Sequence, residues 1–202
     1  MRVNRFTKSV IGCLGCVLVV SLLGACASNR QQEPGTICAK LADNKGWMTA
    51  VRAAKKKWDM PVHVGLAFIH RESSFVANAR PPRKRLLGVL PMGRSSSAYG
   101  YAQATNEAWS DYKKSTGKRF VRRDDFEDAI DFVGWYNDQS NRRLRIKKTD
   151  AYRLYLAYYS GHGGYERGTW RKSKAVQSYA RKAADQSKRY ARELRRCKGR
   201  IR

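Results

Sequence analysis

The sequence predicts a mainly α-helical fold. Apolar residues recur every three or four positions in several stretches, acidic or hydroxyl residues stand where some of these stretches begin, and no stretch shows a convincing alternation of apolar and polar residues. The 202 residues fit a single globular domain once a short N-terminal export segment is set aside.

The N-terminal stretch is predicted to be a targeting segment rather than part of the fold. Basic residues stand within the first eight positions, residues 10–23 form an apolar run that is short for a membrane span, and Leu-Gly-Ala-Cys ends at Cys26. This layout resembles a bacterial lipoprotein signal, which assigns residues 1–25 to the signal peptide and Cys26 to lipidation. An ordinary signal peptide with an incidental cysteine is the alternative. Ala27 after the cysteine, by resemblance to lipoproteins of Gram-negative bacteria, implies the outer membrane, with the domain facing the periplasm.

A polar tether is predicted at residues 26–37, followed by the folded domain at 38–202. The domain keeps two cysteines, Cys38 and Cys197, one near each end. In an oxidising periplasm we expect them to form a disulfide, and two unpaired buried thiols are the alternative. A bridge closing so long a loop would constrain the unfolded chain by about 4–5 kcal/mol in the entropy model.

Helical spacing continues along the domain, interrupted by one long loop. Residues 39–58 show this spacing, and Pro61 suits the first turn of a helix that runs towards Glu72. Residues 77–98 hold three prolines, two glycines and three serines in a row, so we expect a loop that includes a basic insertion at 80–94. The remaining predicted helices are 105–114, one that begins at Asp124, one that is capped by Asp150 and stopped by Ser160 and Gly161, and 171–196.

The charge of the chain points to an anionic partner. Lys and Arg number 42 against 16 Asp and Glu, a formal net charge of +26. The basic residues are spread over the chain and no nucleic-acid motif accompanies them, and an exported protein rarely meets nucleic acid. We therefore expect solvated basic faces that hold the domain against an anionic envelope surface.

Several kinds of site are excluded by the pattern of candidate residues. His63, His70 and His162 are widely spaced and share no metal-ligand pattern, so neither a metal nor a cofactor is expected. Ser73 and Ser74 lack the context of a nucleophile elbow, and no glycine-rich phosphate loop occurs. The remaining candidates lie in three segments, which are residues 72–75 (ESSF), 98–103 (AYGYAQ) and 157–161 (AYYSG).

In order and spacing these segments resemble the motifs of the lytic transglycosylases of the soluble-type SLT family, which are ES, G-L-M-Q and A-Y-N-A-G. The resemblance covers roughly residues 58–170 and implies a lysozyme-like fold of the kind found in goose-type lysozymes. It implies Glu72 as the catalytic acid/base and peptidoglycan glycan strands as the substrate, without metal or cofactor. The residues that it places in the substrate groove are Ser73, Tyr99, Gly100, Tyr101, Gln103, Tyr158 and Tyr159.

The chain departs from the family pattern in two motifs. Tyr101 and Ala102 stand in place of Leu and Met, Tyr159 in place of Asn, and Ser160 in place of Ala. These changes identify a divergent member and affect the positioning of substrate more than the fold.

A single acid near the motifs favours this reaction class. Cleaving a glycosidic bond usually needs two carboxylates, and the nearest acids to Glu72 in sequence are Asp59 and Glu107, which belong to no recognisable motif. A lytic transglycosylase needs only one, because by family resemblance the substrate's acetamido group stabilises the developing cation and the same residue then deprotonates the 6-hydroxyl. The apolar neighbours Phe68 and Ile69 would raise the pKa of Glu72, and the excess of cations would lower it.

Other interpretations remain open at this stage. Glu72 could be a surface charge paired with Arg71 or Arg80, and Gln103 could bond a substrate amide or fasten its own loop. On the same fold the protein could bind wall glycan without cleaving it, open the wall for an envelope secretion complex, or act as a lysozyme-type hydrolase that leaves reducing ends.

Overall fold

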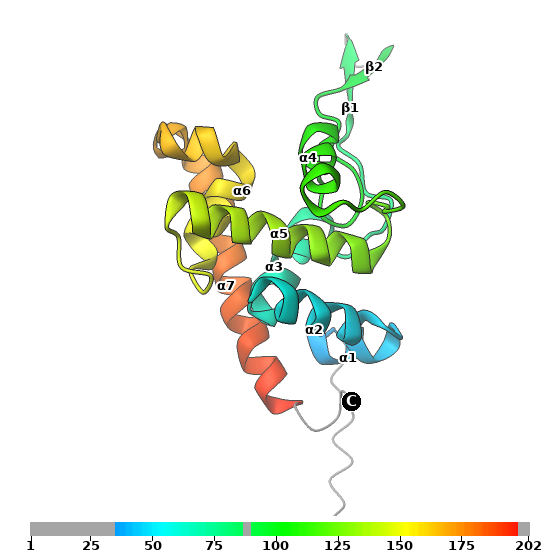
Figure 1. The fold of residues 1–202 in the computed structure, drawn as a ribbon. Helices are drawn as coiled ribbons and strands as arrows, with labels where there is room; N and C mark the ends of the chain where they lie inside the picture. Colours follow the sequence, from blue (N-terminus) through cyan, green and yellow to red (C-terminus); the bar gives the residue numbers. More distant parts are fainter. Residues whose placement is uncertain (1–34, 87–89, 198–202) are drawn as a thin grey trace, which may run out of the picture. The chain divides into compact units, whose positions relative to one another are not determined.

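Helices make up most of the fold, so the mainly α-helical prediction is confirmed. The computed structural model describes residues 35–86 and 90–197 (Figure 1). Its elements in chain order are α1 (Ile37–Asp43), α2 (Trp47–Trp58), α3 (Val62–Ser73), β1 (Arg83–Leu86), β2 (Leu90–Arg94), α4 (Asn106–Thr116), α5 (Phe126–Leu144), α6 (Ala151–Glu166), the 3₁₀ helix η1 (Thr169–Lys172) and α7 (Lys174–Arg196).

The most deeply buried helix is α3. All six residues from Val64 to Ile69 are buried, as expected for a helix that is apolar on every side. Figure 1 shows α3 in the middle of the fold, and it packs against α7, α5 and α2. The helix that carries Glu72 is therefore held rigidly by the core.

Helices α2 and α5 approach closely because α5 has a glycine at the crossing. A Cβ on Gly134 would lie 2.4 Å from Cδ1 of Trp58, at the end of α2, so no larger residue fits without a shift of that ring.

A buried carboxylate on α5 ties three elements together. Asp131 accepts hydrogen bonds from Trp58 Nε1 and from the Tyr112 hydroxyl, both at 2.6 Å. Lys57 and Lys118 form ion pairs with the same carboxylate at 3.3 and 2.9 Å. Burial acts to raise the pKa of Asp131, but the hydrogen bonds from Tyr112, Lys118 and Trp58 outweigh it and hold the pKa below its ordinary value.

The expected loop at 77–98 is partly wrong, because it contains a two-stranded antiparallel ribbon. Strand β1 pairs with β2 in a register that joins Arg83 to Arg94 and Leu86 to Leu90, with an irregularity between Arg83 and Arg85. Figure 1 shows the ribbon extending beyond α4. Its strands of four and five residues are too short for a period-two pattern to stand out from the surrounding prolines and glycines.

Two predicted helices are divided by residues with unusual backbone angles. The helical pattern at 39–58 forms two helices, because Gly46 adopts a left-handed conformation (φ 88°) ahead of α2. The stop predicted at Ser160 and Gly161 is a kink inside α6, where Gly161 has φ 70° and ψ 158°, and the helix then continues to Glu166.

The folded part begins within the predicted tether. Thr36 caps α1 through its hydroxyl, and Ile37 is buried. A disulfide joins Cys38 to Cys197. The signal peptide, Cys26 and most of the tether lie outside the described residues, and in the part described no helix is long and apolar enough to cross a membrane.

Candidate active site

Glu72 lies in the last turn of α3, where the helix ends in an unusual way. Both Ser74 and Phe75 have left-handed backbone angles, with φ of 52° and 66°. Such angles are strained for a bulky residue such as phenylalanine. The buried Phe75 ring is held between Trp47 and His70, with a centroid separation of 5.6 Å from each. This packing fixes the end of α3 and the direction in which Glu72 leaves it.

The carboxyl of Glu72 has the environment of a proton donor. The residue is half-buried, but its Oε1 atom is fully buried and has no hydrogen-bond partner among the described residues. Burial raises the pKa of Glu72 to about 7, although a hydrogen bond from Tyr155 and the charge of Arg71 act to lower the pKa. Such a group exchanges a proton readily near neutral pH.

Two tyrosines of α6 surround the face of α3 that leads to Glu72. Tyr155 and Tyr158 are one helical turn apart, and both rings pack edge-on against Phe68, at 5.1 and 5.4 Å between centroids. Burial raises the pKa of Tyr158 well above its ordinary value, and the nearby Glu72 raises it further. The third predicted motif therefore lies beside the first in space.

The second motif is joined through its backbone to the third motif, and it is also hydrogen-bonded to the loop that follows the first motif. The Tyr158 hydroxyl donates a hydrogen bond to the Ala102 carbonyl at 2.6 Å. Gln103, which has a left-handed backbone (φ 47°), donates from Nε2 to the carbonyls of Ala79 and Gly100 at 2.9 and 2.8 Å. Of the two roles open for Gln103, the structure shows the one that fastens the loop.

Gly100 is required by the geometry of this loop. Its φ is 80°, and an added Cβ would lie 2.0 Å from the carbonyl oxygen of Arg123. The next residue, Tyr101, donates its backbone N–H to the same carbonyl. The second motif is thus held against the segment that precedes α5.

Three of the residues expected in the substrate groove make contacts within the protein. The buried Ser73 hydroxyl donates to the Ile69 carbonyl. Tyr101 packs edge-on against Trp47 and Phe126, at 5.7 and 5.5 Å between centroids. The hydroxyl of Tyr99 donates to Asp124, and the guanidinium groups of Arg80 and Arg123 lie over its ring.

A comparison with protein families shows to which family the chain belongs. The chain matches the family described as Transglycosylase SLT domain over residues 14–197. The chain belongs to this family. Membership implies cleavage of the glycan strands of peptidoglycan and fits the helical, lysozyme-like fold described above. No curated protein matches the chain.

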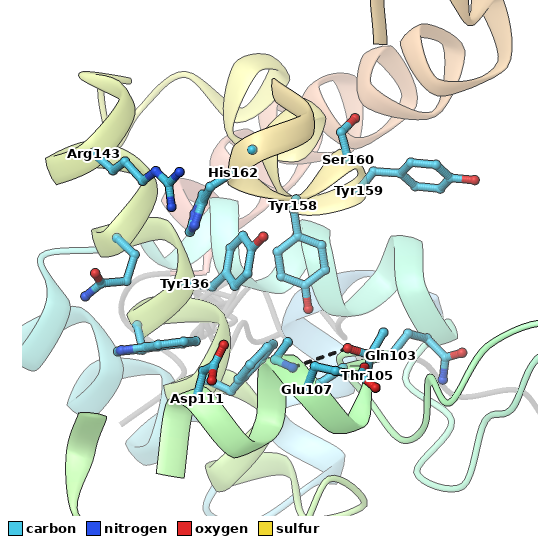
Figure 2. A pocket seen from close by; sticks show the side chains of 17 residues that line it. Gln103, Thr105, Glu107, Asp111, Tyr136, Arg143, Tyr158, Tyr159, Ser160 and His162 are labelled. Atoms are coloured by element: carbon cyan, nitrogen blue, oxygen red, sulfur yellow. Dashed lines mark hydrogen bonds between the residues drawn. The ribbon is translucent and has the colours of Figure 1, made fainter. Parts of the chain in front are cut away.

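A pocket of about 580 Å³ in this SLT domain lies next to the motifs. Gln103, Tyr158 and Tyr159 line it, together with residues of α4 and α5 (Figure 2). Glu72 is not among the lining residues, and the link between them is Tyr158, which faces the pocket and lies close to Glu72. Tyr159 is 52% exposed. An open groove with aromatic walls suits sugar rings.

The pocket has a wall that the motifs did not reveal. His162 stacks on Tyr136 at 4.5 Å between ring centroids, and its Nε2 forms a 2.9 Å hydrogen bond with the Ser140 hydroxyl. Tyr136 in turn packs edge-on against Tyr158 at 5.0 Å. Figure 2 shows Arg143 close to His162 in this wall. The sequence signal for this wall is the helical spacing of Tyr136 with the apolar residues Ile130 and Val133.

Two acidic residues of α4 also line the pocket. Glu107 and Asp111 are one turn apart on α4 (Figure 2). The pKa of Glu107 is lowered by backbone and Thr105 hydrogen bonds at the helix N-terminus, so this carboxylate stays ionised. Among the described residues no group of three His, Cys, Asp or Glu side chains is placed to hold a metal ion.

Proposed function

We propose that this protein is a lytic transglycosylase that cleaves the β-1,4 bond between N-acetylmuramic acid and N-acetylglucosamine and leaves a 1,6-anhydro-muramoyl end. Glu72 is the acid and the base of this reaction. The observation that carries the proposal is the burial of the Glu72 Oε1 atom, which has no hydrogen-bond partner among the described residues, and this burial raises the pKa of Glu72 to about 7.

The reaction needs one proton, which Glu72 first gives and then recovers. The protonated carboxyl donates to the glycosidic oxygen, the bond between that oxygen and C1 of the muramoyl unit breaks, and the acetamido oxygen of the substrate stabilises the cationic C1. The carboxylate then removes the proton of the 6-hydroxyl as O6 bonds to C1. No water is consumed, and Glu72 returns to its protonated state.

The environment of Glu72 supports both halves of this cycle. Burial favours the neutral acid, and the Tyr155 hydrogen bond together with Arg71 stabilises the carboxylate that forms after the proton is given.

Muropeptide analysis tests the reaction and the residue together. Purified sacculi are digested with the protein and with Glu72→Gln, and the released products are identified by mass spectrometry. We expect anhydro-muropeptides from the wild type and at least a thousandfold less from the variant. If both proteins bind sacculi and neither releases products, the result would instead favour a non-catalytic wall-binding lipoprotein. The altered third motif, with Tyr159 in place of Asn, is the reason for considering this alternative.

Hydrolysis is the second candidate reaction, because Glu107 and Asp111 place further carboxylates in the pocket wall. A hydrolase would use one of them to activate water and would leave reducing ends. The same mass spectra separate the two reactions, since an anhydro end is lighter than a reducing end by one water molecule.

We also propose that the protein is an outer-membrane lipoprotein anchored through Cys26 and facing the periplasm. The support is the tripartite N-terminal segment that ends in Leu-Gly-Ala-Cys. Mass spectrometry of the mature N-terminus tests it, and an unmodified Cys26 or cleavage at another site would contradict it.

A further inference from the structure

A second pocket, of about 450 Å³, lies between the C-terminal end of α3 and α7. The α7 side chains in its wall follow helical spacing, so they form one face of that helix. The residues that line the pocket are His70, Arg71, Ser74, Lys182, Asp185, Gln186, Arg189 and Arg192. We call it the basic pocket, because four of these side chains are cationic and one is a carboxylate.

Much of the positive charge in the basic pocket is not neutralised by the protein. Within residues 35–86 and 90–197, Lys182 and Arg192 take part in no ion pair. The one carboxylate, Asp185, is largely exposed and lies 3.8 Å from Lys188, which is outside the pocket wall. An anionic group entering the pocket would find free cations.

The state of His70 agrees with a positive potential in the basic pocket. Burial lowers the pKa of His70, and the charges of Arg189, Arg71 and Lys40 lower it further against the weaker opposing effect of Glu193. The Nδ1 atom of His70 is hydrogen-bonded to the Tyr190 hydroxyl at 2.8 Å.

Two side-chain contacts connect the basic pocket to the pocket next to the motifs. Tyr159, which lines the 580 Å³ pocket next to the motifs, has its ring 5.7 Å from that of Tyr179. The guanidinium of Arg71 lies over the same Tyr179 ring, 5.0 Å from its centroid. Arg71 lines the basic pocket and directly precedes Glu72.

We propose that the basic pocket binds the carboxylates of the peptide stem that a muramoyl unit carries when its glycan strand lies in the groove. This inference rests on the proposed function for its substrate. The sugars of the strand bear no charge apart from their lactyl-linked peptides, whose side chains and terminus carry carboxylates. Guanidinium groups bind carboxylates in a forked geometry, and a lysine adds a point charge that fits either oxygen.

The proposal predicts a preference for strands that carry peptides. The test measures binding of the full mature chain, carrying Glu72→Gln so that the strands stay intact, to sacculi and to the same glycan after an amidase has removed the peptides. The diagnostic variant adds Lys182→Gln and Arg192→Gln. The matched control adds Lys113→Gln and Lys114→Gln, which remove the same charge from exposed positions of α4 outside both pockets.

We expect the diagnostic variant to bind peptide-bearing sacculi about tenfold more weakly and to bind stripped glycan as the parent does. The control variant should keep the parent's preference. Equal losses in both variants, or no preference of the parent for peptides, would overturn the proposal.

One further measurement separates this proposal from binding to a membrane surface. If the diagnostic variant loses binding to anionic phospholipid vesicles and keeps its binding to sacculi, the pocket serves a membrane surface and the proposal fails. All binding is measured with Glu72→Gln proteins, which do not cleave the strands. The result of the binding test therefore does not depend on whether the wild type produces anhydro ends.

Discussion

At the scale of single residues, the pH dependence of activity is the most direct consequence of the Glu72 environment. The group must enter the reaction as the neutral acid, so activity should fall as the pH rises through about 7. The Tyr155 hydrogen bond lowers this pKa, so Tyr155→Phe should move the alkaline limb to higher pH. Initial rates of anhydro-muropeptide release between pH 5 and 9 give the alkaline limb of the wild type and of Tyr155→Phe. If the limb lies at the same pH in both proteins, the role of that hydrogen bond is contradicted.

The same carboxyl should cost stability at alkaline pH. Its pKa is about 7 in the folded chain against an ordinary 4.5, so its favourable contribution is fully present below pH 4.5 and is lost as the pH rises through 7. Glu72→Gln stays neutral, so it should gain about 2 kcal/mol over the wild type between pH 4 and pH 8, less than the full shift implies because Glu72 is only half-buried.

Urea unfolding of both proteins at the two pH values measures this difference. Other titrating groups cancel, since they are common to wild type and variant. An equal stability difference at pH 4 and pH 8 would show that Glu72 has an ordinary pKa.

Sequence alone identified the chemical identity of the candidate residues but not what each one contacts. Glu72 and Tyr158 are close in space, as the motif order suggested, because α3 and α6 pack through Phe68. Ser73 and Tyr101 face their own helix and the core, which no local pattern distinguishes from facing a groove. His162 contacts Tyr136 because α5 packs against α6. The residue spacing within either helix does not indicate such a contact, so it could not be predicted from the sequence.

At the scale of elements, the Asp131 cluster holds α2, α4 and α5 together. Asp131→Asn keeps the size of the side chain and removes the charge that Lys57 and Lys118 face, so we expect a loss of about 2 kcal/mol at pH 7. The pKa of Asp131 is held below its ordinary 3.8, so its contribution is present above that pH and is lost as the pH falls further.

Denaturant unfolding at pH 7 and pH 3 checks this prediction. The difference between wild type and Asp131→Asn should shrink at the lower pH. Asp185→Asn is the control, because that carboxylate is 75% exposed and its removal should change stability little. A comparable loss in both variants would contradict a special role for the buried cluster.

The elements that sequence predicted best are those whose ends carry a chemical signal. Asp125 and Asp150 cap α5 and α6 through their side chains, close to or at the positions expected. The β1–β2 ribbon was missed, because its stability depends on cross-strand pairing rather than on a pattern within either strand. The continuation of α6 beyond Gly161 was missed because glycine commonly ends a helix. Here the backbone kinks at Gly161 and a further helical segment follows.

At the scale of the whole molecule, the two ends of the folded chain are joined twice. The Cys38–Cys197 disulfide closes a loop with a sequence separation of 159, and the Glu193 carboxylate accepts a hydrogen bond from the Ile37 backbone at 2.8 Å. These two links hold the C-terminal end of α7 against the start of α1.

Removing the disulfide should destabilise the domain mainly by freeing the unfolded chain. We expect the double variant Cys38→Ser, Cys197→Ser to lose about 4 kcal/mol of unfolding free energy. Because the hydrogen bond from Ile37 remains and α3 is buried independently of the bridge, the variant should still fold and keep its helical circular dichroism. Urea unfolding with and without a reductant measures the loss. The reductant should lower the stability of the wild type to that of the variant and leave the variant unchanged, whereas a wild type that is insensitive to reductant would show that the bridge contributes nothing to holding the two ends of the domain together.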